Sequence, residues 1–330
     1  MRLLIFGGTQ FVGRYITEAA LAAGHEVTLF NRGRTNSDLF PQVEKIIGDR
    51  NQDLDLLRGR EWDACIDVNA YVPRVVREAL EVLQGAIGQY VFISTISVYA
   101  DNSVPDQTED APLKTLDDPT TEAITPETYG GLKVLCEQAA QEIMGDRTLI
   151  IRPGFVVGPH DHTDRFPYWV RRAAQGGEML APASPDHPIQ FIDARDLAAF
   201  TLRHTEAGTN DIFHVTGPKT PLTWGALLQT CIDVTGGDTR LTWVDEDFIK
   251  AHELVGLGLP MWATSEDSGL LRININKALQ AGLTHRPLTE TVHDTWVWDK
   301  SRPADVEHRF GLTLEREAEL LQLWHEAQGT

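Results

Sequence analysis

A tyrosine and a lysine four residues apart form the most chemically informative pair in this chain. Residues four apart lie on one face of a helix, so Tyr129 and Lys133 would be neighbours there. A phenol has an unperturbed pKa near ~10, which is too high for efficient proton transfer at neutral pH. A nearby ammonium favours the phenolate and lowers that pKa. The pair therefore indicates a general acid/base, Tyr129, whose pKa is lowered by Lys133.

Two hydroxyl groups at the end of a predicted strand lie upstream of this pair. The run 89–95 is nearly all apolar until Ser94 and Thr95, which is typical of a buried strand with a polar end. Residues 96–127 follow as a long polar stretch, a length that usually marks a functional lid or a disordered segment. The helix that carries the tyrosine and the lysine is expected over residues 129–143.

The first fourteen residues predict a phosphate-binding turn. An apolar run over 3–6 reads as a buried strand, a glycine-rich turn follows, and apolar residues then recur at helical spacing. A helix N-terminus presents free N–H groups and a partial positive charge to a phosphate. The turn follows the pattern G-x-x-G-x-x-G, except that Gln10 takes the place of the middle glycine. The residues expected to bind a dinucleotide cofactor at this turn are Gly7, Thr9, Gln10, Phe11, Val12 and Gly13.

Three further strand ends carry polar residues that would meet at the same edge of a parallel sheet. The second strand leads into Asn31, Arg32 and Arg34. An acidic residue there would bind the ribose 2′-hydroxyl of NAD, and a basic one the 2′-phosphate of NADP. Because the acid is absent and two cations are present, the sequence favours NADP, with NAD still open. The third and fourth strands end at residues that would line the same cofactor site, Asp49, Arg50 and Asn69.

The alternation of apolar strands with helices predicts an α/β fold. Strands that are continuously apolar are buried on both faces, which indicates a Rossmann-type, doubly wound parallel sheet with helices on both faces. Residues 1–153 and 186–215 are expected to form this dinucleotide-binding domain. Residues 154–185 and 216–330, which hold crowded turns and most of the tryptophans, are expected to form a smaller α+β domain that binds the substrate.

The bulk composition disfavours several classes of protein. The net charge of −19, from 29 basic and 48 acidic residues, opposes binding to nucleic acid or to anionic membranes. No apolar run approaches the ~20 residues that span a bilayer, and we expect no signal peptide. Three widely spaced cysteines without a C-x-x-C pair indicate reduced thiols, so we expect a cytoplasmic protein, either a monomer or a homodimer. Histidines and aspartates at 160–164 lack the helical spacing of a zinc-protease motif, and we expect no metal.

Taken together, these motifs resemble the short-chain dehydrogenase/reductase superfamily, in its extended, atypical branch with NAD-dependent epimerase/dehydratase-like members. The resemblance implies that Tyr129 is the general acid/base and that Lys133 binds the nicotinamide ribose. It also implies that Thr95, with Ser94 in reserve, polarises the substrate oxygen, and that Asp49 contacts the adenine. The segments that carry the resemblance lie within residues 1–215 and are Gly7–Gly13, Gly48–Arg50, Ser94–Tyr99, Tyr129-x-x-x-Lys133, Arg152–Gly154 with Gly158-Pro159, and Phe191–Asp196.

We therefore expect an NAD(P)-dependent oxidoreductase that transfers a hydride to or from a small carbonyl or hydroxyl substrate. Sugar-nucleotide epimerases usually follow the sixth strand with an asparagine that helps bind the diphosphate, and the run 152–155 contains none. An NAD-dependent sugar or nucleotide-sugar epimerase/dehydratase remains the first alternative. A non-catalytic nucleotide-sensing or RNA-binding relative is the second, because branches of the family with this kind of glycine turn include chloroplast RNA-binding proteins.

Overall fold

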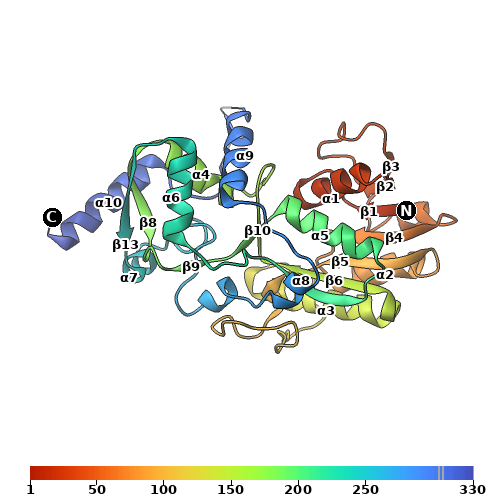
Figure 1. Ribbon diagram of the computed structural model, residues 1–330. Helices are drawn as coiled ribbons and strands as arrows, with labels where there is room; N and C mark the ends of the chain where they lie inside the picture. Colours follow the sequence, from red (N-terminus) through yellow and green to blue (C-terminus); the bar gives the residue numbers. More distant parts are fainter. Residues whose placement is uncertain (304, 307, 330) are drawn as a thin grey trace.

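A seven-stranded sheet, in which all neighbouring strands are parallel, forms the centre of the larger of two lobes (Figure 1). The computed structural model describes residues 1–303, 305–306 and 308–329. The strand order is β11-β6-β5-β4-β1-β2-β3, which confirms the predicted Rossmann-type α/β fold. The strands are β1 (Arg2–Phe6), β2 (Glu26–Asn31), β3 (Glu44–Ile47), β4 (Trp62–Asp67), β5 (Ile87–Ile93), β6 (Thr148–Pro153) and β11 (Asp211–Val215).

Helices cover both faces of this sheet because its side chains are apolar on both sides. In β1, Leu3 and Ile5 pack toward α1 and α5, whereas Leu4 and Phe6 pack toward α2 and α3. Along the chain, the sheet grows from β1 to β2 and β3, and then continues on the other side of β1 at β4. Such a reversal opens a crevice at the carboxyl ends of β1 and β4. The covering helices are α1 (Phe11–Ala22), α5 (Ala194–Glu206), α2 (Pro73–Leu83) and α3 (Pro126–Met144).

Two boundaries near the site differ from the sequence expectation. α3 begins at Pro126, three residues before Tyr129, because the side chain of Thr125 caps its first turn and proline is well tolerated at the first helical position. β5 ends at Ile93, so the two hydroxyl-bearing residues after it belong to a turn and not to the strand. The polar stretch that follows holds a short 3₁₀ helix and otherwise runs without regular structure up to α3, as expected.

The second lobe packs around its own apolar core, which is rich in tryptophan. Trp169 and Trp224 are fully buried and meet edge to face with ring centroids 4.7 Å apart. The lobe ends in α10, which Figure 1 shows projecting away from the body at the C-terminus. No described helix is long and apolar enough to cross a membrane. The elements of this lobe are α4 (Arg165–Ala174), β8 (Gly177–Pro182), α6 (Trp224–Thr235), β13 (Thr239–Val244), α7 (Glu246–Ala251), α9 (Leu288–Lys300) and α10 (Leu314–Gln328), with β8 and β13 paired in parallel.

Short strands connect the two lobes. β7 (Phe155–Val157) pairs with β10 (Phe191–Asp193), and β9 (Pro188–Ile189) pairs with β12 (Leu222–Thr223). The domain boundary expected after residue 153 would therefore pass between paired strands, and the division into two domains stays a prediction. The small α8 (Asn276–Gln280) packs against β11. The 3₁₀ helices are Leu54–Leu57, Ile96–Val98, Gly145–Arg147 and Ser268–Leu271.

A buried ion pair joins β6 to α3 beneath the turn that follows β5. Arg152 and Glu137 are 1% and 2% exposed, and the guanidinium donates twice to the carboxylate, at 3.0 and 2.7 Å. Ser94 also donates to Glu137, and Arg152 donates to the hydroxyl of Tyr99 at 2.8 Å. Desolvated charges are tolerated only when they are paired in this way. The pair therefore holds the position of the turn that carries Ser94.

We predict that Glu137→Leu lowers the free energy of unfolding by about 3–5 kcal/mol, because it leaves the guanidinium of Arg152 buried without its partner. The double variant Glu137→Leu/Arg152→Met should recover much of that loss, because no uncompensated charge remains. Urea unfolding at neutral pH measures both. Removing Glu122 from its exposed pair with Arg74 is the matched control and should cost far less. A double variant as unstable as the single one would contradict the prediction.

Candidate functional site

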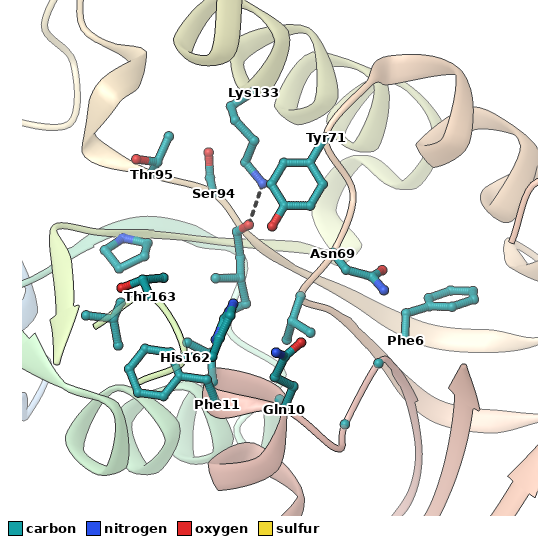
Figure 2. Close-up of a pocket in the computed structure, with 18 of the residues that line it drawn as sticks. Phe6, Gln10, Phe11, Asn69, Tyr71, Ser94, Thr95, Lys133, His162 and Thr163 are labelled. Atoms are coloured by element: carbon teal, nitrogen blue, oxygen red, sulfur yellow. Dashed lines mark hydrogen bonds between the residues drawn. The ribbon is translucent and has the colours of Figure 1, made fainter. Parts of the chain in front are cut away.

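A cavity of about 750 Å³ lies at the carboxyl ends of the central strands and is closed on one side by the second lobe. The structure brings all the residues predicted for the site to the wall of this one cavity. They are Gly7, Thr9, Gln10, Phe11, Val12, Gly13, Asn31, Arg32, Arg34, Asp49, Arg50, Asn69, Thr95, Tyr129 and Lys133. Figure 2 shows Gln10 and Phe11 on one side of it and Lys133 and Tyr71 on another.

The glycine turn at the start of α1 has the geometry of an anion cradle. Gly7 and Gly8 adopt φ angles of +99° and +86°, which side chains disfavour. A Cβ atom on Gly13 would lie 2.8 Å from the backbone nitrogen of Gly8, so the helix and the turn touch through their backbones. α1 has no side-chain cap and no acidic residue in its first turn. Its first N–H groups therefore remain available to a ligand in the cavity.

Gln10 does not distort this turn. Its backbone is extended, at φ −133° and ψ 133°, a conformation that any residue adopts, so the position does not require glycine. Its side chain is exposed and its amide lies at the cavity wall (Figure 2). The substitution in the glycine pattern thus places a hydrogen-bonding group at the cavity wall on an unstrained backbone position; the positive φ, +38°, falls on the next residue, Phe11. The uncapped N–H groups of this turn are the donors that a dinucleotide pyrophosphate would need, and its binding here stays a prediction.

Asn31, one of the predicted cofactor residues, is hydrogen-bonded within the protein. The amide of Asn31 donates to the carbonyl of Gly7 and accepts from the N–H of Gly33, both at 2.9 Å. Asn31 therefore braces the turn. Arg32 and Arg34 line the cavity and form no ion pair within 4.0 Å with any described residue, although their charges help to lower the pKa of the nearby Asp49. Because Asn31 is hydrogen-bonded within the protein and the two arginines have no ion pair, we expect Arg32 and Arg34, more than Asn31, to bind a ribose phosphate.

Arg50 is likewise held by the protein. Its terminal nitrogens bond both oxygens of the buried Asp67 at 3.0 and 2.7 Å, and one of them also bonds the side-chain oxygen of Asn69 at 2.6 Å. These bonds fix the ends of β4 and β3 relative to one another. Beside them, hydrogen bonds from Asn51 hold the pKa of Asp49 below its ordinary value, so Asp49 is ionised at the cavity wall.

Tyr129 and Thr95, the residues predicted to transfer a proton and to hold the substrate oxygen, line the cavity together. Burial raises the pKa of Tyr129, so the predicted lowering of this pKa by Lys133 is wrong; the hydrogen bond with the hydroxyl of Thr95 acts against the effect of burial. The hydroxyl oxygen of Thr95 also accepts from the N–H of Ser97 at 3.1 Å, and this bond restricts the side-chain rotamer. The residue lines the cavity. Ser94, the reserve candidate, donates its hydroxyl to the buried Glu137 and serves the core. The geometry therefore favours Thr95 over Ser94 as the hydroxyl available to a substrate.

Lys133 lies on α3 one turn after the tyrosine and is fully desolvated. Its ammonium donates to the carbonyls of Ala70 and Ile93 at 3.0 and 2.7 Å and lies 4.0 Å from the ring centroid of Phe92. Burial lowers its pKa to about 8. An ammonium has three donors, so one remains for a ligand in the cavity that it lines. The ammonium is thus fixed between the ends of β4 and β5.

Several residues at this cavity carried no usable signal in the sequence. Tyr71 lies at the cavity wall with its ring 6.4 Å from that of Tyr129, and it follows a predicted strand end at Asn69. Ala263, Leu270 and Leu271 come from a C-terminal segment without a recognisable motif. Phe155 follows β6, and the loop 160–165, which the family resemblance places at the edge of the substrate site, contributes His162, Thr163 and Arg165. Within the described ranges, no group of three His, Cys, Asp or Glu side chains converges as a metal site would require.

Comparisons with known proteins agree with this geometry. Residues 3–215 match the family described as the NAD dependent epimerase/dehydratase family. A relative from Arabidopsis thaliana, named chloroplast stem-loop binding protein of 41 kDa b, is 25% identical over 254 residues, which is 71% of this chain and 63% of that protein. The chain therefore spans less than two thirds of that relative's length.

Solved structures share the fold over nearly the whole chain. The UDP-glucuronic acid 4-epimerase of Bacillus cereus, in complex with NAD, is 16% identical with a TM-score of 0.67, covering 91% of this chain and 97% of that one. The UDP-Glc/GlcNAc 4-epimerase of Campylobacter jejuni is 16% identical with a TM-score of 0.69, covering 91% and 99%. At such identities, the likeness establishes the fold.

We predict that the wild type gains stability relative to Lys133→Met as the pH rises from about 8 toward 10.5. In that pH window Lys133 still binds its proton in the unfolded chain and has released it in the folded chain. The contribution of this lysine to the free energy of unfolding therefore rises with pH, by on the order of 3 kcal/mol. Urea unfolding of both proteins at a series of pH values measures the difference. Lys219→Met, at an exposed lysine, is the control. A wild type and a Lys133→Met variant whose stabilities run parallel with pH would contradict the prediction.

Proposed function

Because the chain belongs to the NAD dependent epimerase/dehydratase family, we propose that its cavity binds a nicotinamide dinucleotide and that hydride transfer takes place at the end lined by Tyr129. Family membership makes the protein an NAD-dependent enzyme. One observation carries the proposal. A single cavity has an uncapped helix N-terminus behind a glycine turn at one end and Thr95, Tyr129 and Lys133 at the other.

Each of these residues has a chemical task in the proposal. The nicotinamide, when bound, supplies the hydride acceptor and donor. Tyr129 moves the proton on the substrate oxygen, and Thr95 holds that oxygen by a hydrogen bond. The third N–H of the Lys133 ammonium, which no protein group accepts, binds a ribose hydroxyl. The N–H groups at the start of α1 hold the pyrophosphate, with the amide of Gln10 beside them.

Among the reactions open to such a site, a redox-neutral epimerisation or dehydration of a sugar-like hydroxyl compound is the one we propose. Membership of the epimerase/dehydratase family supports it more than it supports a simple reductase, which the sequence alone favoured. The named epimerases that share the fold act on UDP-sugars, which adds support for a sugar or nucleotide-sugar substrate. We also propose that the second lobe covers the substrate, since its helix α4 contributes Arg165 to the cavity wall.

The choice between NAD and NADP rests on the arginines after β2. Two solved structures with this fold contain NAD, which supports NAD as the cofactor. Arg32 and Arg34 line the cavity without ion-pair partners in the described part of the chain, which still supports binding of a 2′-phosphate. We therefore propose a site that accepts NAD and in which these arginines set the affinity for NADP.

RNA binding is the second candidate function, because the Arabidopsis relative is named for binding a stem-loop. The net charge of −19 works against a polyanionic partner. A binding protein also has no need for a desolvated lysine beside a tyrosine at the wall of a cavity, since holding that ammonium out of water is costly.

We predict that Tyr129→Phe lowers kcat by about 10²–10⁴-fold while the protein still binds NAD, because the ring remains and only the proton-carrying hydroxyl is lost. Turnover of UDP-glucose or a free sugar measures the first effect, and quenching of protein fluorescence on titration with NADH measures the second. Tyr71→Phe is the matched control at the same cavity wall. A wild type that binds neither NADH nor NADPH would overturn the proposal. Stem-loop RNA binding as the sole activity, unchanged in Tyr129→Phe, would establish the second candidate instead.

We predict that Arg32→Ala/Arg34→Ala weakens NADPH binding by about tenfold or more and changes NADH binding far less, because charge-assisted bonds to the 2′-phosphate are lost. Fluorescence titrations with both cofactors on both proteins give the four dissociation constants. Equal changes in the dissociation constants of NADPH and NADH would show that the arginines do not bind the 2′-phosphate.

A further inference from the structure

The wall of the cavity next to Thr95 is apolar. Ile96 follows Thr95 directly and begins a 3₁₀ helix, which the hydroxyl of Thr95 caps. Leu270, from a distant segment of the chain, packs against the cluster that contains Ile96. The same distant segment brings two further apolar side chains to the cavity. Together these residues form an apolar wall, which consists of Ile96, Ala263, Leu270 and Leu271.

Backbone contacts hold the apolar wall against the long polar stretch that precedes α3. A Cβ atom on Gly269 would lie 2.5 Å and 2.6 Å from the carbonyl oxygens of Asn102 and Val104, so the two segments touch through their backbones. The N–H of Asp106 donates to the carbonyl of Arg272 at 2.7 Å. These contacts flank the 3₁₀ helix that carries both leucines of the wall. The apolar wall is therefore pre-formed, as the surfaces of ligand pockets usually are.

The carboxylates and amides of the cavity come from its cofactor side. They lie on the glycine turn and at the ends of β2, β3 and β4. Near the apolar wall, the hydroxyl of Thr163 is already bonded, because it donates to Asp161 at 2.6 Å and accepts from Arg165 at 3.0 Å. Among the described residues, those that line the cavity with a carboxylate or an amide are Gln10, Asn31, Asp49, Asn51 and Asn69.

This distribution of polar groups limits what can face the apolar wall. A free sugar carries a hydroxyl on most of its carbons, and each hydroxyl loses its hydrogen bonds to water when it is buried against apolar atoms. Carboxylates and amides could replace those bonds, but the apolar wall supplies neither. A substrate that presents a hydrocarbon surface to this wall loses no hydrogen bonds there and gains the free energy of apolar burial.

We propose that the substrate carries an apolar group, a hydrocarbon chain or ring, beside its reacting carbon, and that this group packs on the apolar wall. The reacting hydroxyl meets Thr95 and Tyr129, where the wall begins. The inference rests on the proposed function and narrows its substrate class. Among sugar-like hydroxyl compounds, it selects those that bear an apolar group at this position.

Calorimetric titration of the full-length protein, with and without saturating NADH, tests the inference. The probes are the straight-chain alcohols from 1-butanol to 1-octanol, with glucose as the polar comparison. We expect the affinity of the wild type to rise about three- to fourfold with each added methylene, because each one removes a similar apolar area from water. We expect glucose to bind more weakly than 1-hexanol.

Leu270→Asn places an amide in the apolar wall and should reduce this rise to less than about twofold per methylene. Leu270→Ala removes apolar surface without adding a polar group and should give an intermediate rise, which keeps the test valid if the asparagine variant does not fold. Leu323→Asn, at an exposed leucine of α10 outside the cavity, is the matched control and should follow the wild type. Circular dichroism verifies that each variant is folded.

A wild type whose affinity does not change with chain length, or that binds glucose as tightly as 1-hexanol, would overturn the inference. A chain-length dependence that both Leu270 variants leave unchanged would also overturn it, because the alcohols would then bind elsewhere. A protein that binds no NADH yet shows a chain-length dependence that requires Leu270 would overturn the proposed function and leave the apolar wall standing as a binding surface.

Discussion

The parallel direction of the seven strands is the constraint on which the rest of this structure depends. Because every strand ends at the same edge of the sheet, polar residues separated by more than a hundred positions in the chain meet in one cavity. The reversal of strand order between β1 and β4 places the start of α1 at that edge, where its free N–H groups face the cavity. Parallel strands need crossover helices, and these same helices supply Tyr129 and Lys133.

Buried charges hold this edge in place. Arg50 with Asp67 fixes the ends of β3 and β4, and Arg152 with Glu137 fixes the turn after β5. Lys133 has no carboxylate partner within 4.0 Å among the described residues and relies on two backbone carbonyls and an aromatic ring. Such an arrangement is costly in stability, because desolvation disfavours the ammonium. In the function we propose, this cost is offset because the ammonium binds the ribose of the cofactor.

The sequence predicted the sheet, its helices and the wall of the cavity because these depend on local patterns. Continuous apolar runs mark buried strands, and a polar residue at the end of such a run marks the edge of the sheet, as at Thr95. Which side chains form hydrogen bonds within the protein, and so are not free to bind a ligand, could not be predicted in this way. That Arg50 and Asn31 are bonded within the protein depends on Asp67 and Gly33, and therefore on how loops from different strands pack.

The substrate end was the least predictable part, for the same physical reason. Leu270 and Leu271 line the cavity from a distant segment whose Leu270 packs against the cluster around Ile96, and that segment has no motif that marks them. The preference between NAD and NADP could not be predicted from the sequence pattern either. Arg32 and Arg34 are as consistent with a solvent-exposed turn as with a binding site for the 2′-phosphate. By contrast, Gln10, which looked like a defect in the glycine motif, occupies an extended backbone position that never required glycine.

A crystal structure of the protein grown with NAD tests the central claim most directly. We predict that the pyrophosphate lies against the backbone N–H groups of Phe11 and Val12, and that the nicotinamide ribose contacts Lys133 with the ring facing Tyr129. A cavity without nucleotide at saturating NAD, or a nucleotide bound with its nicotinamide away from Tyr129, would contradict the claim.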